Sequence, residues 1–334
     1  MKTNPITYAL IAGLLSGALF FSPAVRAVMP PHEEAADSDN DDADTPSADA
    51  DKDDQDSDQS EEKQAEAPPE HNAKMHVKGH VEAEAKTTAQ SAQPNLKVAS
   101  GSWWHPHPGT KWAIQYAGKI DTSLNVAVYD IDLVDTDDAV FKTLRAKGKK
   151  IICYFSAGSF EAWRPDAKQF PPSVLGKSNG WKAEKWLDIR KLEILKPIMA
   201  ARIDLAKQKG CDALDPDNVE GYDNASGFPL TEADQIAYNK MIAELGHAAG
   251  MAVGLKNDVD QVGDLIDDFD FQVNEQCFEY SACNRLAPFI KANKPVFNIE
   301  YNVDAAKFCP QANAMNFDSV KKKLELDGWV KACR

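Results

Sequence analysis

The motifs that this 334-residue chain lacks already exclude several kinds of chemistry. No Gly-x-Ser-x-Gly elbow occurs, so the usual Ser-His-Asp hydrolase arrangement is not supported. No glycine-rich phosphate loop follows the first candidate strand, which counts against a dinucleotide-binding fold. Histidine is scarce after residue 100, and no Cys-x-x-Cys pair is present. Carboxylate chemistry is therefore favoured over metal-dependent hydrolysis, and we expect neither a metal nor a cofactor.

Long apolar runs are also scarce. The run Tyr8–Phe21 follows Lys2 and precedes the small-residue sequence Val25-Arg26-Ala27, the pattern of a secretory signal peptide. The run is shorter than the roughly 20 residues that a membrane-spanning helix needs. We therefore expect a signal peptide over residues 1–27, no membrane span, and a secreted or periplasmic protein.

Residues 28–98 contain few aromatic or β-branched residues. From residue 31 to residue 70 there are 17 Asp and Glu and two Lys, a net charge of −15. Such a segment cannot bury enough apolar surface to offset its ordering entropy, so we predict a disordered acidic linker. The whole chain also has a net charge of −15, so the remaining residues sum to about zero. The linker is either a solubilising spacer or an electrostatic tether for a polycation or the cell envelope.

Residues 99–334 read as a globular domain in which short apolar strands alternate with amphipathic helices. The candidate helices are 137–147, 191–209, 231–249, 258–267 and 286–293. The candidate strands are 112–116, 126–133, 150–155, 213–215, 252–256, 269–274, 295–299 and a last one near Ala314. Eight strands with helical crossovers in about 234 residues predict a (β/α)₈ TIM barrel, an α/β fold.

All six cysteines lie in this domain, and an even number in an exported protein favours disulfides. Six cysteines allow 15 pairings. Proximity in sequence favours Cys277–Cys283 and Cys309–Cys333. Cys153 and Cys211 would then form a third disulfide or remain buried thiols.

Polar residues follow almost every candidate strand, and in a parallel barrel these positions surround one mouth, where active sites lie. Two carboxylates on different strands are sufficient for glycosidic cleavage, with one as nucleophile or base and the other as acid. Three tryptophans in the long segment after the third strand either stack on sugar rings or fill the barrel mouth: Trp163, Trp181 and Trp186. The strand-end residues are Gln115, Tyr116, Asp130, Asp132, Tyr154, Ser156, Asp215, Asp217, Asn218, Lys256, Asn257, Asn274, Glu275, Glu300 and Tyr301.

Eight sequence segments together resemble glycoside hydrolase family 114, the endo-α-1,4-polygalactosaminidases. They occur in the family's order between Trp103 and Tyr301 and cover most of the folded region. The segments are WWHPHPGTKWAIQYAG, VYDIDLVDT, KKIICYFSAGSFEAWRPDA, EKWLDIR, KGCDALDPDNVEGYDN, GLKND, NEQCFEY and KPVFNIEY.

This resemblance implies a (β/α)₈ barrel that hydrolyses internal bonds of α-1,4-linked galactosamine chains. It also implies a catalytic pair, the second Asp of the DPDN run and the Glu of the NEQC run. In this chain these residues are Asp217, which we assign as nucleophile, and Glu275, which we assign as general acid and base. Members of the family often have Glu where this chain has Asp215.

A galactosamine polymer carries ammonium groups, so we expect its cleft to be acidic. Such carboxylates would also raise the pKa of a neighbouring acid, and Lys256 would pair with Asp217 or bind a hydroxyl. The candidate substrate-binding residues are Tyr116, Asp130, Asp132, Tyr154, Trp163, Asp215, Asn218, Lys256, Glu300 and Tyr301.

Three other functions remain open at this point. The barrel could cleave another α-linked amino sugar or galactoside, it could bind polysaccharide without cleaving it, or the acidic linker could make the chain a surface-display protein. We expect a polysaccharide as the partner, no nucleic acid, and a monomer.

Overall fold

The structure is a computed structural model, and it describes residues 103–334. The predicted signal peptide (1–27) and acidic linker (28–98) lie outside these residues. Within them, none of the helices combines the length and the apolar composition that crossing a membrane requires.

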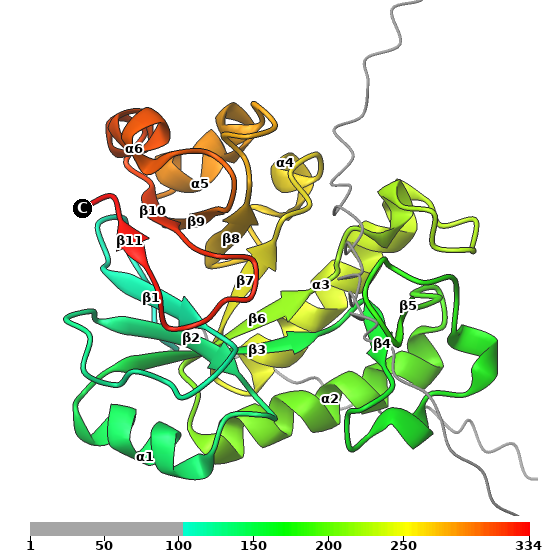
Figure 1. Ribbon diagram of the computed structural model, residues 1–334. Coiled ribbons are helices and arrows are strands. Elements are labelled where there is room, and N and C mark those ends of the chain that lie inside the picture. The colour runs from blue at the N-terminus through cyan, green and yellow to red at the C-terminus, as the bar shows by residue number, and fades with distance from the viewer. Residues whose placement is uncertain (1–102) are drawn as a thin grey trace, which may run out of the picture. The chain divides into compact units, whose positions relative to one another are not determined.

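Eight parallel strands form a strongly curled sheet, with the helices outside it (Figure 1). Their order in the sheet is β1-β2-β3-β6-β7-β8-β9-β10, the order in which they occur in the chain. The predicted TIM-barrel fold is thus confirmed in its essential part. The strands are β1 (Trp112–Gln115), β2 (Val128–Asp132), β3 (Lys150–Ser156), β6 (Ala213–Asp217), β7 (Ala252–Lys256), β8 (Phe271–Glu275), β9 (Val296–Glu300) and β10 (Asp318–Lys321).

Six α-helices connect these strands: α1 (Asp138–Ala146), α2 (Leu192–Lys209), α3 (Glu232–Ala248), α4 (Val262–Leu265), α5 (Ala287–Lys291) and α6 (Ala305–Ala314). Thr231 caps α3: its side chain accepts from the Asp234 backbone N–H, and the Asp234 carboxylate accepts from the Thr231 backbone N–H in return. Gly210 ends α2 at φ 81°, where a left-handed residue is needed. Two predictions were wrong: the stretch 258–267 forms only the single turn α4, and Ala314 ends α6 instead of lying in a strand.

The edges of the sheet meet without a regular β1–β10 ladder. The outer edge of β10 pairs antiparallel with β11 (Lys331–Ala332), and the Trp112 indole donates to the Asp318 carbonyl at 2.7 Å. The segment between β10 and β11 (red in Figure 1) also reaches β1, because the Leu326 carbonyl accepts from the Tyr116 N–H at 3.0 Å. The barrel is therefore completed by the C-terminal segment.

The barrel interior follows the two-residue alternation of strands. Val128 on β2, Ala213 on β6 and Phe297 with Ile299 on β9 belong to one apolar cluster inside the sheet. A second, larger cluster lies between the strands and the helices. Every second residue of a strand points inward. These inward residues are apolar near the amino ends of the strands and polar at the carboxyl ends.

A hairpin and several short helices outside the parallel sheet shape the mouth of the barrel at the carboxyl ends of the strands. A two-stranded antiparallel hairpin, β4 (Ser159–Glu161) with β5 (Glu184–Trp186), follows β3. The short 3₁₀ helices are η1 (Ala167–Gln169), η2 (Pro172–Val174), η3 (Gly221–Asp223) and η4 (Cys283–Leu286). The connection between β3 and α2 is thus a structured insertion at the mouth.

The two disulfides expected from proximity, Cys277–Cys283 and Cys309–Cys333, are present, and the two alternatives left open for Cys153 and Cys211 are decided in favour of a third disulfide. This third disulfide ties β3 to Cys211, two residues before β6, across 58 residues of sequence. Three disulfides are typical of a protein of an oxidising, extracytoplasmic compartment.

His247, in α3, has a structural role. Its imidazole stacks on Trp103 with ring centroids 4.2 Å apart, and its Nε2 lies 2.8 Å from Asp270 Oδ2. The Trp103 indole donates to the other oxygen of the same carboxylate at 3.0 Å. These contacts attach the start of the described chain to the outside of the barrel.

Candidate active site

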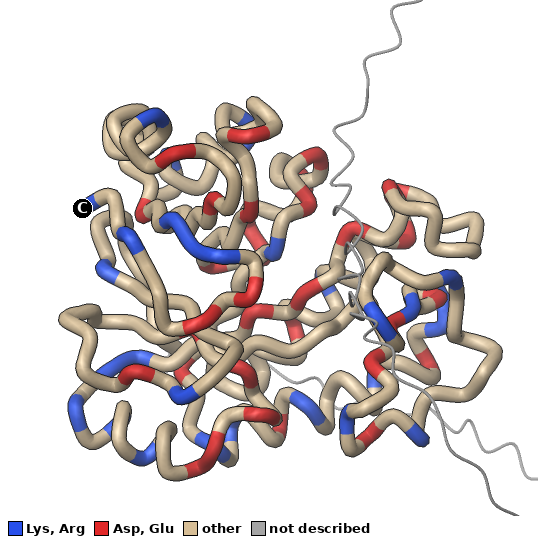
Figure 2. Tube along the Cα trace, viewed as in Figure 1, with Lys and Arg blue, Asp and Glu red and all other residues tan. Residues whose placement is uncertain are grey.

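A cleft of about 450 Å³ opens at the carboxyl ends of the strands, and both predicted catalytic carboxylates line it. This volume is typical of a small-molecule or sugar site. Acidic residues stand on several of the strand ends and loops around it (Figure 2). Of the predicted substrate-binding residues, seven line the cleft: Tyr116, Asp132, Tyr154, Trp163, Asn218, Lys256 and Tyr301.

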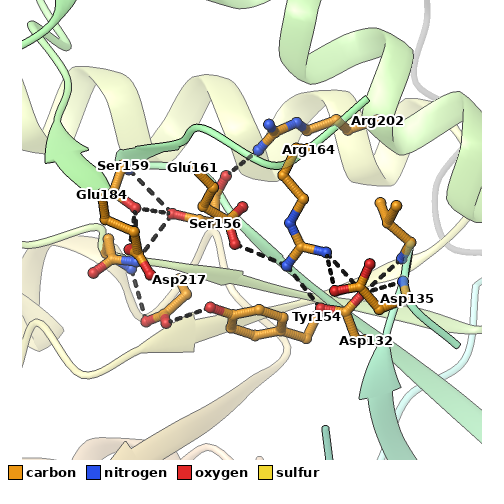
Figure 3. Close-up of polar contacts among 12 residues, drawn as sticks. Asp132, Asp135, Tyr154, Ser156, Ser159, Glu161, Arg164, Glu184, Arg202 and Asp217 are labelled. Carbon is orange, nitrogen blue, oxygen red and sulfur yellow. Dashed lines mark hydrogen bonds and ion pairs between the residues drawn. The ribbon is translucent and has the colours of Figure 1, made fainter. Parts of the chain in front are cut away.

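Asp217 is the last residue of β6, and its backbone is fixed to the end of β3. Its carbonyl accepts from the N–H groups of Ala157 and Gly158 at 2.8 and 3.0 Å. Gly158 is required here, since a Cβ at that position would lie 1.7 Å from the Asn218 carbonyl oxygen. One Asp217 carboxylate oxygen accepts from the Tyr154 hydroxyl at 3.1 Å (Figure 3). The side chain is therefore held in one orientation toward the cleft.

Lys256, at the end of β7, supplies the positive charge beside Asp217. Its Nζ lies 3.4 Å from Asp217 Oδ1 and 3.7 Å from Asp215 Oδ2, and its side chain is 1% exposed. Burial opposes the charge of this ammonium, but the two carboxylates outweigh burial and hold the pKa of Lys256 well above its usual value. Lys256 therefore remains a cation that the two aspartates share.

Asp130 and Asp215 lie beneath this pair, joined by the Tyr116 hydroxyl at 3.2 and 3.0 Å. Burial raises the pKa of Asp130 well above its usual range and that of Asp215 to about 6, while Lys256 lowers both. A phenol has one proton and can donate to only one carboxylate. Both contacts are satisfied when Asp130 carries its own proton and donates it to the phenolic oxygen.

Glu275, the last residue of β8, is positioned from both sides. Its N–H donates to Asn257 Oδ1 at 2.9 Å, and its carboxylate accepts a hydrogen bond from the Tyr301 hydroxyl. Burial and the neighbouring Glu275 carboxylate raise the pKa of Tyr301 well above its usual value, so the phenol stays a donor. Asp217 thus has a cationic partner and Glu275 a neutral one.

Arg164 holds the wall of the cleft beyond Tyr154. Its guanidinium makes two hydrogen bonds to Asp132, at 3.0 and 2.7 Å, and further contacts to Asp135 at 3.1 Å and Glu161 at 2.8 Å. Asp132 also accepts from two backbone N–H groups of the following turn. Asp132 lines the cleft as predicted, but its carboxylate is engaged within the protein.

Three residues predicted to bind substrate lie off the cleft surface. Asp130 and Asp215 are fully buried one layer below it. Glu300 faces the other side of the sheet, because Phe297 and Ile299 of the same strand point inward. Its carboxylate accepts from the backbone N–H groups of Phe278 and Glu279 at 2.9 and 3.3 Å, so it orders the loop after β8.

The strand-end argument missed the carboxylates that come from loops and from the hairpin. Those that line the cleft are Asp135, Glu161, Glu184, Glu220, Asp223, Asp258, Asp260 and Glu325. Sequence reasoning could have found Asp258, because it directly follows the strand-end residues Lys256 and Asn257 in the GLKND segment. Burial, with a contribution from Asp260, raises its pKa to about 8.

The loop tryptophans divide between the two roles considered for them. Trp163 is 51% exposed at the cleft, where its ring is available to a sugar. Trp186 is 6% exposed and packs against Gly221, where an added Cβ would lie 3.3 Å from the indole. Trp163 is therefore positioned for stacking and Trp186 fills the base of the mouth, while Trp181 also lines the cleft.

A curled sheet of eight parallel strands with two carboxylates at its carboxyl ends is the arrangement that barrel glycosidases use. The comparison with family models agrees: the model for glycoside-hydrolase family GH114 matches residues 93–334. The chain belongs to this family and is a glycoside hydrolase.

Solved structures support the same assignment. The chain is similar to Aspergillus fumigatus Ega3, crystallised in complex with galactosamine, at 42% identity and a TM-score of 0.66. That match covers 70% of this chain and 100% of Ega3. The glycoside hydrolase domain of PelA from Pseudomonas aeruginosa matches at 11% identity and a TM-score of 0.54, over 66% of this chain and 98% of that one, which shows a shared fold. A search of curated protein sequences gave no significant match.

Proposed function

We propose that the protein hydrolyses internal α-1,4 linkages of a galactosamine polymer with Asp217 and Glu275 as the catalytic pair. The observation that carries this proposal is the contrast between the two carboxylates. Asp217 lies 3.4 Å from the Lys256 ammonium, whereas Glu275 accepts from the neutral phenol of Tyr301. A glycosidase needs one group that attacks as a carboxylate and one that delivers a proton.

In the proposed reaction Asp217 attacks the anomeric carbon while Glu275 protonates the departing glycosidic oxygen. A water then attacks the same carbon, Glu275 takes up its proton, and Asp217 leaves as a carboxylate. Lys256 and the Tyr154 hydroxyl, 3.1 Å from Asp217, orient the carboxylate throughout. Atoms and charges balance without a further reactant.

The charge of the cleft supports a cationic substrate. Eleven Asp and Glu side chains line it, against two basic ones, Arg164 and Lys256. Both basic groups are already paired within the protein. A polymer with one ammonium per sugar would be concentrated by such a surface. The similarity to a protein crystallised with galactosamine supports the same substrate class.

The test is the release of short oligomers from deacetylated α-1,4-galactosaminan by the wild type, Asp217→Asn and Glu275→Gln. Asp135→Asn is the matched control, because Asp135 lines the same cleft with a 58% exposed side chain. We expect products from the wild type and the control, and none from the other two. Normal hydrolysis by either catalytic variant would contradict the assignment. A folded wild type that releases nothing would point to another polymer.

We further propose export through the predicted signal peptide and action as a monomer outside the cytoplasm. The pairing of all six cysteines supports export. Secreted protein beginning at Val28, with no free thiols and a monomer mass by light scattering, is the expected result. Retention in the cytoplasm with reduced cysteines would contradict export, and a dimer mass would contradict the monomer.

A further inference from the structure

The β4–β5 hairpin carries two glutamates in direct cross-strand register. Glu161 is paired with Glu184, and Ser159 with Trp186, which places all four side chains on one face of the hairpin. Both glutamates line the cleft. Figure 3 shows them with Ser156 and Ser159 near the Tyr154–Asp217 hydrogen bond.

This pairing is unfavourable unless a cation is present. Like charges directly opposite one another destabilise an antiparallel pair. The nearby cation, Arg164, is already shared among Asp132, Asp135 and Glu161. Among residues 103–334, Glu184 accepts only from neutral donors, the Ser159 hydroxyl at 3.0 Å and the Asn179 amide at 2.7 Å.

Glu161 also has an oxygen without a partner. Its side chain is 3% exposed, Oε1 contacts Arg164, and Oε2 is buried with no hydrogen-bond partner among the described residues. Burial raises the pKa of both Glu161 and Glu184, and for Glu184 the charge of Glu161 adds to it. A buried acceptor left unmatched is destabilising, so a donor from a ligand would be favoured here.

The hairpin is connected to the catalytic carboxylate through short polar contacts. Ser159 lies between Glu184 and Asn218, with Oγ 3.0 Å from Glu184 Oε2 and 3.4 Å from Asn218 Nδ2. The N–H of Asn218 donates to Asp217 Oδ1 at 2.8 Å. A group bound by the two glutamates would therefore belong to a sugar close to the reacting bond.

We propose that Glu161 and Glu184 form an ammonium-binding subsite that recognises the 2-amino group of a galactosamine unit beside the catalytic pair. This inference rests on the proposed function. A primary ammonium has three donors and one charge, matching two acidic acceptors. The described residues contain no group of three or more His, Cys, Asp or Glu that could hold a metal ion, so an organic cation fits better. An N-acetyl group has neither the charge nor the three donors, so this subsite would reject it.

The first experiment measures binding of galactosamine, galactose and N-acetylgalactosamine to the full protein by NMR titration, with and without Glu184→Gln. Monosaccharides contain no bond to cleave, so this readout is independent of hydrolysis. We expect the wild type to bind galactosamine more tightly than the other two sugars. In Glu184→Gln this ratio of affinities should fall about tenfold, the scale of one charge-assisted hydrogen bond. Glu325→Gln, also on the cleft lining, is the control and should retain the preference.

Glu184→Gln is the safer variant because its partners are neutral, whereas Glu161→Gln also removes a contact to Arg164. An unchanged preference in Glu184→Gln, or an equal loss in Glu325→Gln, would overturn the subsite in favour of general electrostatics. The two proposals separate cleanly. If the polymer is cut but Glu184 does not affect preference, only the subsite fails; if Glu184 controls preference but the polymer is not cut, only the proposed function fails.

Discussion

Lys256→Met is the perturbation for which the structure gives the clearest expectation. The substitution keeps most of the volume of a side chain that is 1% exposed but removes the charge shared by Asp215 and Asp217. Four acidic groups then face one another without this cation, because Asp130 and Glu275 interact with Lys256 as well as Asp215 and Asp217. The variant should lose both stability and activity.

The magnitude follows from the two distances. At an effective dielectric constant of about 20, charges 3.4 and 3.7 Å apart each attract by about 5 kcal/mol. Desolvation of the ammonium offsets part of this attraction, and breaking a buried pair by removing one partner typically costs about 3–5 kcal/mol. We expect a loss of about 3–5 kcal/mol in unfolding free energy and a fall in kcat on the order of 100-fold, similar to losing one preorganised electrostatic contact.

The stability loss should also depend on pH. The pKa of Asp215 is about 6 in the fold against an ordinary 3.8, and Lys256 lowers it, so Lys256→Met raises it further. A carboxyl with a raised folded pKa contributes stability at low pH that is lost as pH rises through that pKa. In the variant this loss extends to higher pH, so its deficit should be larger at pH 8 than at pH 5.

The assay combines urea unfolding at both pH values with kcat on the polymer. Lys322→Met is the matched control, since Lys322 is also buried but donates to the Asp327 carbonyl. Burial lowers the pKa of Lys322 to about 8, so removing its charge should be neutral or stabilising near pH 7. The reasoning is refuted if Lys256→Met is as stable as wild type at pH 8, or if its deficit does not change with pH.

Three further predictions follow from single contacts. Asp258→Asn should raise Tm at pH 8 and not at pH 4, because the folded pKa of about 8 makes the wild type lose stability as pH rises; a pH-independent change in Tm would contradict this. Tyr301→Phe removes the donor to Glu275 and should lower kcat about tenfold with a small change in KM; unchanged kcat would exclude a positioning role. Replacing Cys153–Cys211 with alanines should cost about 4 kcal/mol and replacing Cys277–Cys283 about 2, from loops of 58 and 6 residues, and equal losses by urea unfolding would argue against loop entropy.

The sequence was sufficient to predict the strands that begin as short apolar runs and end in polar residues, such as β6 and β7. The β7 bounds were predicted correctly at both ends, and β6 was missed by two residues only at its carboxyl end. The prediction of the last strand was wrong because that strand lacks this pattern. β10 has the sequence DSVK, with one inward apolar residue, and it follows a helix whose alanines resemble a buried strand.

The placement of Glu300 shows how one residue of register decides a functional prediction. Ending the seventh strand at Ile299 made Glu300 the first residue of the mouth, but β9 continues to Glu300 itself. Since successive side chains point to opposite faces, an inward Ile299 turns Glu300 outward. The neighbouring Tyr301 then points inward and reaches Glu275.

The hairpin glutamates could not be predicted from local sequence. Glu161 and Glu184 are 23 positions apart in a segment that reads as a tryptophan-containing loop, and only long-range pairing places them opposite one another. Sequence patterns report which face of a strand is buried, but they do not report which short strands meet across an insertion.

The distribution of charge explains why the buried and exposed acids have different roles. Lys256 and Arg164 each serve several carboxylates, so neither can neutralise all its neighbours. Below the cleft, this shortage of positive charge is relieved within the protein, because Asp130 is buried deeply enough to hold a proton. At the cleft wall Glu161 and Glu184 line the cleft, so in the proposed subsite a cationic ligand supplies the missing positive charge. The same deficit of positive charge thus favours a protonated Asp130 under Asp217 and an acidic wall beside it, an arrangement that suits the cationic substrate proposed above.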